Sequence, residues 1–239
     1  MNKFYIYKFF DKEEYRNTFL SGLLYSNKLS YYREHENKTM GVTDIFENAD
    51  IISIADDAHY VNHILHEIDN NLYVEHKCYD SKPEGYKEKQ AFISYNKCDY
   101  NVFCASTIIT DTQNNVVAFD KKNKKNFGNY GVIIINTQVF IERLKDSIRY
   151  NKNVYQFWAN FVKYLDYKKR NSIQYWSPFM KFDFFKEQQE WRIVFDAETN
   201  EVLNYNLGDI HDICYLINDK DKFFDSIVEG AQLNKGILL

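Results

Sequence analysis

Short runs of branched and aromatic residues recur along this chain, and they constrain its fold more than any other feature. Strands are typically runs of about four to eight such residues with polar stretches between them. The runs lie at residues 4–9, 23–26, 51–55, 72–76, 91–95, 102–109, 116–119, 132–135 and 191–195. Residues 161–166 alternate more loosely, and we expect a strand there as well. The sequence therefore predicts a protein rich in short strands.

Helical patterns interrupt these runs at a few places. Asp11 can cap a helix that carries Glu13 and Glu14 in its first turn and ends at Gly22. Asn136 or Thr137 can cap a second helix. Its apolar residues are spaced to face the core, and they are Val139, Phe140, Ile141, Leu144 and Ile148. The tail after residue 208 predicts a strand followed by a helix over about residues 220–230.

These elements predict the α+β class, with mixed, mostly antiparallel sheets flanked by short helices. The chain has 239 residues, of which 45% are hydrophobic, which is ample for a sizeable core. It contains no linker rich in Pro, Gly or Ser and no internal repeat. We therefore expect a single domain over residues 1–239.

Charge and cysteine usage narrow the classes of function. The formal net charge is -4, so no overall field draws the chain towards nucleic acid or an anionic membrane. The cysteines, Cys78, Cys98, Cys104 and Cys214, form no CxxC pair, which favours reduced thiols. No run approaches the roughly 18 apolar residues of a membrane span. We expect a cytoplasmic protein without a membrane partner.

The most informative segment is 184–195, FFKEQQEWRIVF. Gln188 and Glu190 are two residues apart, so at the entrance of a strand their side chains would point to the same face. A carboxylate and an amide together could orient a ribose and stabilise a sugar cation as its leaving group departs. An NAD-cleaving transferase needs this chemistry. The alternative is that Glu190 pairs with Arg192 or a lysine on a solvated strand face.

Several short motifs resemble a group of bacterial proteins that includes abortive-infection proteins of the AbiGi kind. They are the first strand around Tyr7, the Gly-Leu-Leu-Tyr-Ser turn at 22–26, the Asp-Ile-Phe-Glu element at 44–47, Tyr-Gly-Val-Ile-Ile at 130–134 and Glu-Trp-Arg at 190–192. Their order is also similar to that of ADP-ribosyltransferases that modify nucleic acid or protein.

The resemblance implies roles for particular residues. Tyr7 or Lys8 would lie near the nicotinamide ribose of NAD, Tyr130 would stack on the ring, and Glu190 would be catalytic together with Gln188. An ADP-ribosyltransferase-like fold is implied as well. The chain departs from those enzymes because its first strand carries no Arg or His and it has no Ser-Thr-Ser triplet.

A second candidate site lies in the stretch from Tyr31 to Asp50, which has neither helical nor strand spacing. A long irregular segment within a domain is often a functional loop. Arg33 could clamp a phosphate while Tyr31 and Tyr32 stack a base, with Asp44 and Glu47 nearby in sequence. An ordinary surface loop with salt bridges explains the same residues.

Two further patterns have simpler explanations. His59, His63 and His66 would share one helix face and could bind zinc, but the polar residues around them are typical of an exposed helix, and we assign no metal. The basic runs at 121–125 and 168–170 could bind single-stranded nucleic acid through their charge and the tyrosines near them. Such runs are more often simply solvated.

From these patterns we predict an NAD-dependent ADP-ribosyltransferase-like protein in phage–host conflict, either a defence toxin or a counter-defence protein. Glu190 and Gln188 would be catalytic, and Tyr7, Lys8, Tyr130 and Arg33 would bind NAD. A protein or a nucleic acid would be the acceptor. The alternative is a binding module that captures a nucleotide signal or a partner protein without chemistry.

Overall fold

The computed structural model describes residues 2–34, 47, 49–55, 74–78, 90–95, 99–149, 153–166, 174–197 and 201–233. The chain divides into two compact units. The first contains Met1–Lys28, Asn101–Val162 and Glu187–Leu239, and the second contains Leu29–Tyr100 and Lys163–Lys186. The single domain that we expect over residues 1–239 stays a prediction.

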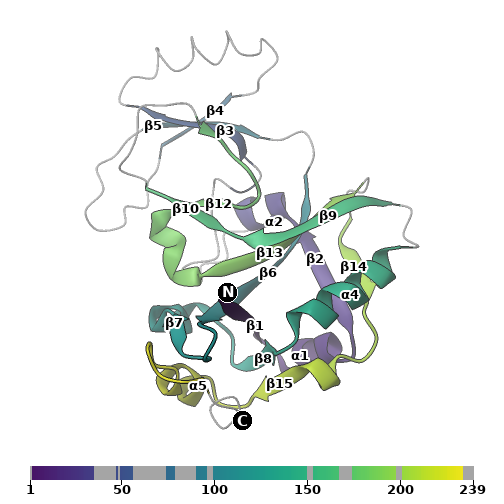
Figure 1. Ribbon diagram of the computed structural model, residues 1–239. Coiled ribbons are helices and arrows are strands. Elements are labelled where there is room, and N and C mark those ends of the chain that lie inside the picture. The colour runs from purple at the N-terminus through teal and green to yellow at the C-terminus, as the bar shows by residue number, and fades with distance from the viewer. Residues whose placement is uncertain are drawn as a thin grey trace. The chain divides into compact units, whose positions relative to one another are not determined.

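The first unit is built on a nine-stranded sheet (Figure 1). Its strands are β1 (Lys3–Phe10), β2 (Leu23–Lys28), β6 (Asn101–Thr110), β7 (Val116–Ala118), β8 (Tyr130–Ile134), β9 (Val154–Phe161), β13 (Glu190–Ala197), β14 (Leu203–Asn206) and β15 (Cys214–Ile217). They follow the order β14-β2-β6-β1-β8-β15, while β13 and β7 also pair with β6, and β9 pairs with β13. All of these pairs are antiparallel. The predicted α+β class with mostly antiparallel sheet is confirmed.

Helices cover both faces of this sheet. They are α1 (Glu13–Leu20), α4 (Thr137–Ile148), α5 (Lys220–Ser226), and the short 3-10 helices η1 (Lys121–Asn126) and η3 (His211–Ile213). Phe19 of α1 and Phe140 of α4 pack on one face, in the same core cluster as Trp191. Phe224 of α5 packs on the other face, in a cluster that includes Tyr7. Each face of the sheet therefore has its own core.

Of the two helix caps predicted from the sequence, the structure contains the one at the start of α4 but not the one at the start of α1. Asn136 caps α4 as expected, because its side chain accepts a hydrogen bond from the amide of Val139 at 3.1 Å. The cap expected at Asp11 is wrong: Lys12 precedes α1 and makes no side-chain cap. Gly22 follows α1 with φ +101°, and a Cβ there would lie 1.9 Å from the carbonyl oxygen of Gly208. Glycine is therefore required at this turn.

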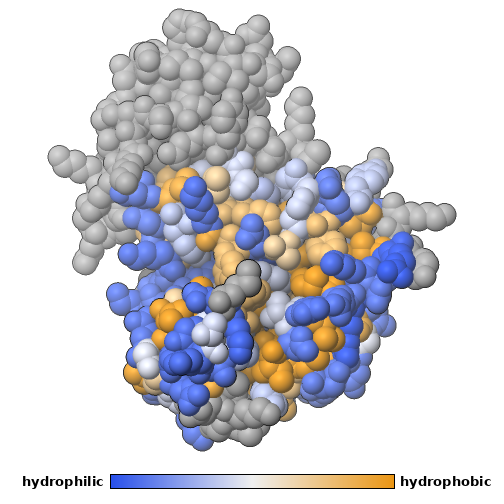
Figure 2. Space-filling view, viewed as in Figure 1, coloured by the Kyte–Doolittle hydropathy of each residue, from blue (hydrophilic) through white to orange (hydrophobic). Residues whose placement is uncertain are grey.

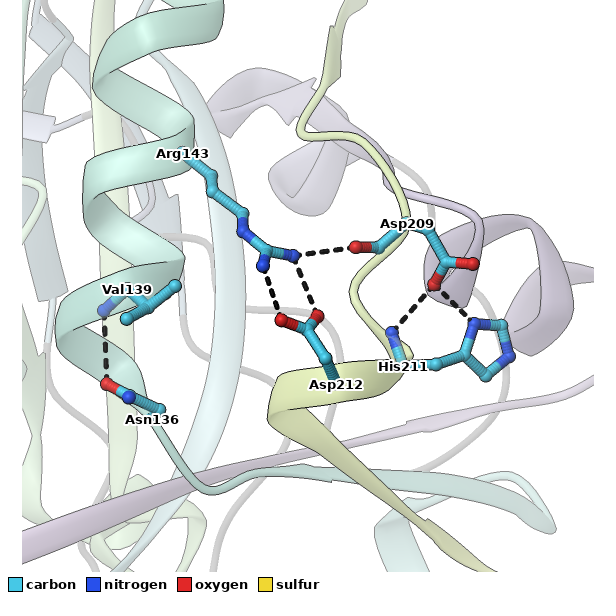
Figure 3. Close-up of polar contacts among 6 residues, drawn as sticks. All are labelled: Asn136, Val139, Arg143, Asp209, His211 and Asp212. Atoms are coloured by element: carbon cyan, nitrogen blue, oxygen red, sulfur yellow. Dashed lines mark hydrogen bonds and ion pairs between the residues drawn. The ribbon is translucent and has the colours of Figure 1, made fainter.

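Arg143 of α4 forms hydrogen bonds with the loop that precedes β15 (Figure 3). Its guanidinium donates to Asp212 Oδ1 at 2.9 Å and Oδ2 at 2.5 Å, and to the carbonyl oxygen of Asp209 at 2.6 Å. Asp209 in turn accepts hydrogen bonds from the amide and the ring of His211. These contacts hold the pKa of both carboxyls, Asp209 and Asp212, below their usual range.

The second unit contains two small sheets and a short helix. Their elements are α2 (Leu29–Glu34), β3 (Ala49–Ala55), β4 (Val74–Cys78), β5 (Gln90–Tyr95), β10 (Lys163–Leu165), β11 (Gln174–Tyr175) and β12 (Met180–Phe182). Four strands pair in the order β11-β3-β5-β4, and β10 pairs with β12 in parallel. The irregular stretch expected over residues 31–50 is wrong at both ends, because α2 covers residues 31–34 and β3 begins at residue 49. Residues 161–166 belong to the end of β9 and to β10, so the strand expected there is interrupted.

Strand β9 carries large hydrophobic side chains that the rest of the first unit leaves exposed. Tyr155 is 64% exposed and Trp158 is 41% exposed. Figure 2 shows hydrophobic residues along this part of the surface, over β9 and β13. Across the residues described, no helix is both long enough and apolar enough to cross a membrane.

Candidate functional site

Glu190 is the first residue of β13 and is buried, with 7% of its surface exposed. Arg192 lies two residues further along the strand and so projects to the same face. Its Nε donates to Glu190 Oε1 at 2.7 Å and its Nη2 donates to Oε2 at 3.3 Å. The pairing of Glu190 with Arg192 that the sequence allowed as an alternative is therefore present. It is a buried ion pair, however, and does not lie on a solvated strand face.

Neighbouring strands place Glu190 in one row with the first strand of the chain. Ser106 of β6 is the cross-strand neighbour of Glu190 on one side and of Tyr7 on the other. Residues in one such row project to the same face of a sheet. The structure therefore brings Tyr7 and Glu190 to the same face, with Ser106 between them.

The turn before Glu190 does not have the geometry that the sequence suggested for Gln188. Gln188 is the last residue of η2 (Asp183–Gln188), not part of a strand, and Gln189 has φ 42°. Alternation along a strand therefore cannot put Gln188 and Glu190 on one face. The turn is fixed by Thr107, whose amide and hydroxyl donate to the carbonyl of Gln189 at 3.1 and 3.0 Å.

Asn123 of η1 completes the polar surroundings of Glu190. Its side chain is fully buried, and its Nδ2 donates to Ser106 Oγ at 3.2 Å and to the carbonyl of Gln188 at 3.1 Å. Ser106 is the cross-strand neighbour of Glu190, and Gln188 precedes it by two residues along the chain. Buried polar groups that are hydrogen-bonded in this way fix one local arrangement.

Tyr7 lies in the aromatic core that covers the same face. Its ring centroid is 5.5 Å from that of Phe223, 5.8 Å from that of Phe127 and 6.0 Å from that of Phe119. Its exposed fraction is 0%. The ring of Tyr7 is therefore packed among phenylalanine rings, on the sheet face that also carries Ser106 and Glu190.

Lys8 occupies a gap in the sheet. Strand β6 pairs with β2 at residues 101–102 and with β1 at residues 106–110, so residues 103–105 face the space between β1 and β2. There Lys8 Nζ donates to the carbonyl of Cys104 at 2.6 Å and lies 4.9 Å from the ring centroid of Phe103. Burial lowers the pKa of Lys8, while the charges of Cys104 and Glu190 act to raise it.

Tyr130 does not join this group. It is on β8 in alternation with Val132 and Ile134, whose side chains pack in the core beneath α1 and α4. The guanidinium carbon of Arg16, in α1, lies 5.6 Å from the centroid of the Tyr130 ring. Tyr130 thus faces α1, on the side of the sheet opposite Glu190.

The second candidate site is described only in part. The rings of Tyr31 and Tyr32 meet edge to face at 5.5 Å, and the side chain of Arg33 lies outside the described residues, as does Asp44. Glu47 is buried and forms an ion pair with Lys181 at 3.3 Å, so it is not an exposed loop carboxylate.

The remaining sequence candidates are a histidine group and two lysine runs. His59, His63 and His66, and the run at 168–170, lie outside the described residues. Within the described ranges, no three His, Cys, Asp or Glu side chains come together as a metal site requires. Lys124 of the first run forms ion pairs with Asp221 at 3.0 Å and Asp225 at 3.6 Å, which both belong to α5.

Three residues around Glu190 were not found from the sequence, namely Ser106, Thr107 and Asn123. No local pattern marks them, because each reaches Glu190 or its turn from another part of the chain. Ser106 and Thr107 lie in the predicted strand run 102–109, and Asn123 lies in the basic run 121–125, but neither pattern points to Glu190.

In comparisons with known proteins, no family model, curated protein or solved structure matches this chain. The likeness to AbiGi-type and ADP-ribosyltransferase proteins therefore depends on the short motifs and their order.

Proposed function

We propose that this protein is an NAD-dependent ADP-ribosyltransferase-like protein of phage–host conflict, with Glu190 as its functional carboxylate. The observation that supports this best is the position of Glu190, buried beside Ser106 on the sheet face that also carries Tyr7. The order of the sequence motifs supports it too. An ADP-ribosyltransferase-like fold and a cytoplasmic location belong to the same proposal.

In the proposed reaction, the bond between the nicotinamide nitrogen and ribose C1′ breaks, and its electron pair leaves with nicotinamide. Glu190 stabilises the cationic ribose. A nucleophile on protein or nucleic acid then bonds to C1′ and releases its proton to solvent. Arg192 donates hydrogen bonds to both oxygens of Glu190 and thereby holds the carboxyl group in one orientation.

The other predicted contacts divide between the two sheet faces. Tyr7 shares the face of Glu190 and is the NAD contact that we retain there. Lys8 follows Tyr7 on β1 and lies over the ring of Phe103 in the core of the other face, so its contact with NAD stays a prediction. Gln188 would orient the ribose from the end of η2. Tyr130 faces α1 and has no part in this site, and Arg33 stays a prediction for the phosphates.

Release of nicotinamide from NAD tests the proposal. We expect release by the wild type and its loss in Glu190→Gln, which keeps size but removes charge. Glu142→Gln is the matched control, because Glu142 is on the exposed side of α4 and bonds only locally, to Gln138 at 3.0 Å. Each variant is first shown to be folded by circular dichroism. Equal release by the wild type and Glu190→Gln would remove the catalytic assignment.

A second function is favoured by the ion pair itself. A carboxylate that is bound through both oxygens to Arg192 has a structural role whether or not chemistry occurs. The protein would then be a binding module for a nucleotide or a partner protein. This version expects NAD or another nucleotide to raise the melting temperature without any product, since a ligand of the folded state stabilises it by mass action.

A further inference from the structure

Residues 120–127, which we call the strap, connect β7 to β8 and contain η1. Lysine occupies four of the five positions between 121 and 125, with Asn123 in the middle. Like charges so close together repel one another. The position of the strap therefore depends on what holds it from both sides.

On its inner side the strap is hydrogen-bonded to Ser106, the cross-strand neighbour of Glu190, and to the two residues that precede Glu190. Asn123 donates to Ser106 Oγ and to the carbonyl of Gln188, as described above. The amide of Asp120 donates to the side-chain oxygen of Gln189 at 3.0 Å. In the closed position, the strap therefore occupies the space beside Ser106 and Glu190.

On its outer side the strap is held by charge. Lys124 Nζ lies 3.0 Å from Asp221 and 3.6 Å from Asp225, and Lys121 Nζ donates to the carbonyl of Asp225 at 3.3 Å. Both aspartate side chains are 72% exposed. Figure 2 shows mainly hydrophilic residues where α5 lies in Figure 1. Exposed ion pairs of this kind are weakened by salt.

We propose that the strap controls access to the face that carries Ser106 and Glu190, and that its ion pairs with α5 hold it closed. Removing the α5 carboxylates deprives Lys124 of its acidic partners, and repulsion among the neighbouring lysines then favours the open position. Salt weakens the same ion pairs. The inference rests on the proposed function only in naming NAD as the molecule admitted. Access itself can be measured without NAD.

Alkylation of a thiol introduced by Ser106→Cys reports access directly. Ser106 is 4% exposed and lies under Asn123, so the thiol reacts with iodoacetamide only when the strap opens. Labelling is assigned to residue 106, and separated from the free Cys104 in the same peptide, by fragmentation in the mass spectrometer, after circular dichroism shows that the variant is folded. We expect the rate to rise about two- to tenfold between low salt and about 0.5 M salt, as the loss of two exposed ion pairs implies.

Charge variants in the same background give the sharper test. Asp221→Asn with Asp225→Asn should raise labelling at low salt, and added salt should no longer raise it further. The control, Glu142→Gln with Asp146→Asn, makes the same change in net charge on the exposed side of α4. The inference is overturned if labelling is unchanged by salt, or if both pairs of substitutions have the same effect.

Nicotinamide release by the two double variants without Ser106→Cys separates the two proposals. Faster labelling with no nicotinamide release by any protein would support the strap proposal and reject the transferase proposal. Nicotinamide release without any change in labelling would reject the strap proposal and support the transferase proposal.

Discussion

Tyr7 and Glu190 are both cross-strand neighbours of Ser106, yet their side chains lie in opposite kinds of surroundings. Tyr7 is enclosed by phenylalanine rings, whereas Glu190 is bound to the guanidinium of Arg192. One row of the sheet thus passes from an aromatic core to a buried charge within three strands.

The energy of the Glu190–Arg192 pair can be measured with a double-mutant cycle. Glu190→Gln or Arg192→Met leaves one charge buried without its partner, and we expect each to lower the free energy of unfolding by about 3–5 kcal/mol. The double variant should lose about 1–3 kcal/mol less than the sum of the two single losses. Urea unfolding measures all four proteins. Additive losses would mean that the pair is not energetically coupled.

The turn between α1 and β2 allows a comparison of two glycines. Gly22→Ala adds a Cβ 1.9 Å from the carbonyl oxygen of Gly208, at φ +101°, whereas Gly230→Ala at φ +79° meets nothing within 4 Å. We expect Gly230→Ala to cost roughly 1–2 kcal/mol through backbone strain alone. Gly22→Ala should cost clearly more, because the backbone must also move. Thermal unfolding of both variants measures these losses of stability. Equal losses would show that the contact with the Gly208 carbonyl adds no cost at Gly22.

The sequence indicates the local elements of this fold well and the site poorly. The spacing of Phe140 and Leu144 and the cap at Asn136 are local signals, and α4 follows them. The cap predicted at Asp11 failed because capping also depends on where the backbone turns, which no single residue type sets. Strand β13 begins at Glu190, one residue before the predicted run, so the strand was also found.

The surroundings of Glu190 depend on pairings between distant segments. Ser106 lies beside Glu190 because β6 pairs with β13 in a particular register. If β13 shifted by one residue against β6, Glu190 would project to the other face of the sheet. The sequence does not set this register by local spacing. Tyr130 shows the same limit, since a one-dimensional order of motifs cannot tell which face of β8 it occupies.

Lys8 should stabilise the gap between β1 and β2. Lys8→Met keeps the aliphatic stem but removes the donor to the carbonyl of Cys104, and we expect a loss of about 1–3 kcal/mol for a buried carbonyl left without that donor. Lys3→Met on the same strand removes an exposed bond to Asn114 at 3.3 Å and should change stability by less than about 0.5 kcal/mol. Urea unfolding compares the two. A similar effect from both would show that the Lys8 bond is not structural.

Cys214 gives the fold a measurable sensitivity to alkaline pH. Burial raises the pKa of its thiol from the ordinary 9.0 to about 12. Between these values the unfolded chain loses the thiol proton while the folded protein keeps it. The contribution of this thiol to stability is therefore complete below about pH 9 and is lost as the pH rises towards 12, with a slope of about 1.4 kcal/mol per pH unit.

Comparison with Cys214→Ala isolates this effect. The lowered pKa of Lys8 acts in the opposite direction, because the folded protein then binds that proton more weakly than the unfolded chain. Both proteins contain Lys8, so its contribution cancels in the difference between them. Urea unfolding from pH 8 upwards should show the wild type losing its advantage over Cys214→Ala as the pH passes about 9. A constant difference across this range would mean that the thiol ionises as easily in the folded protein as in the unfolded chain.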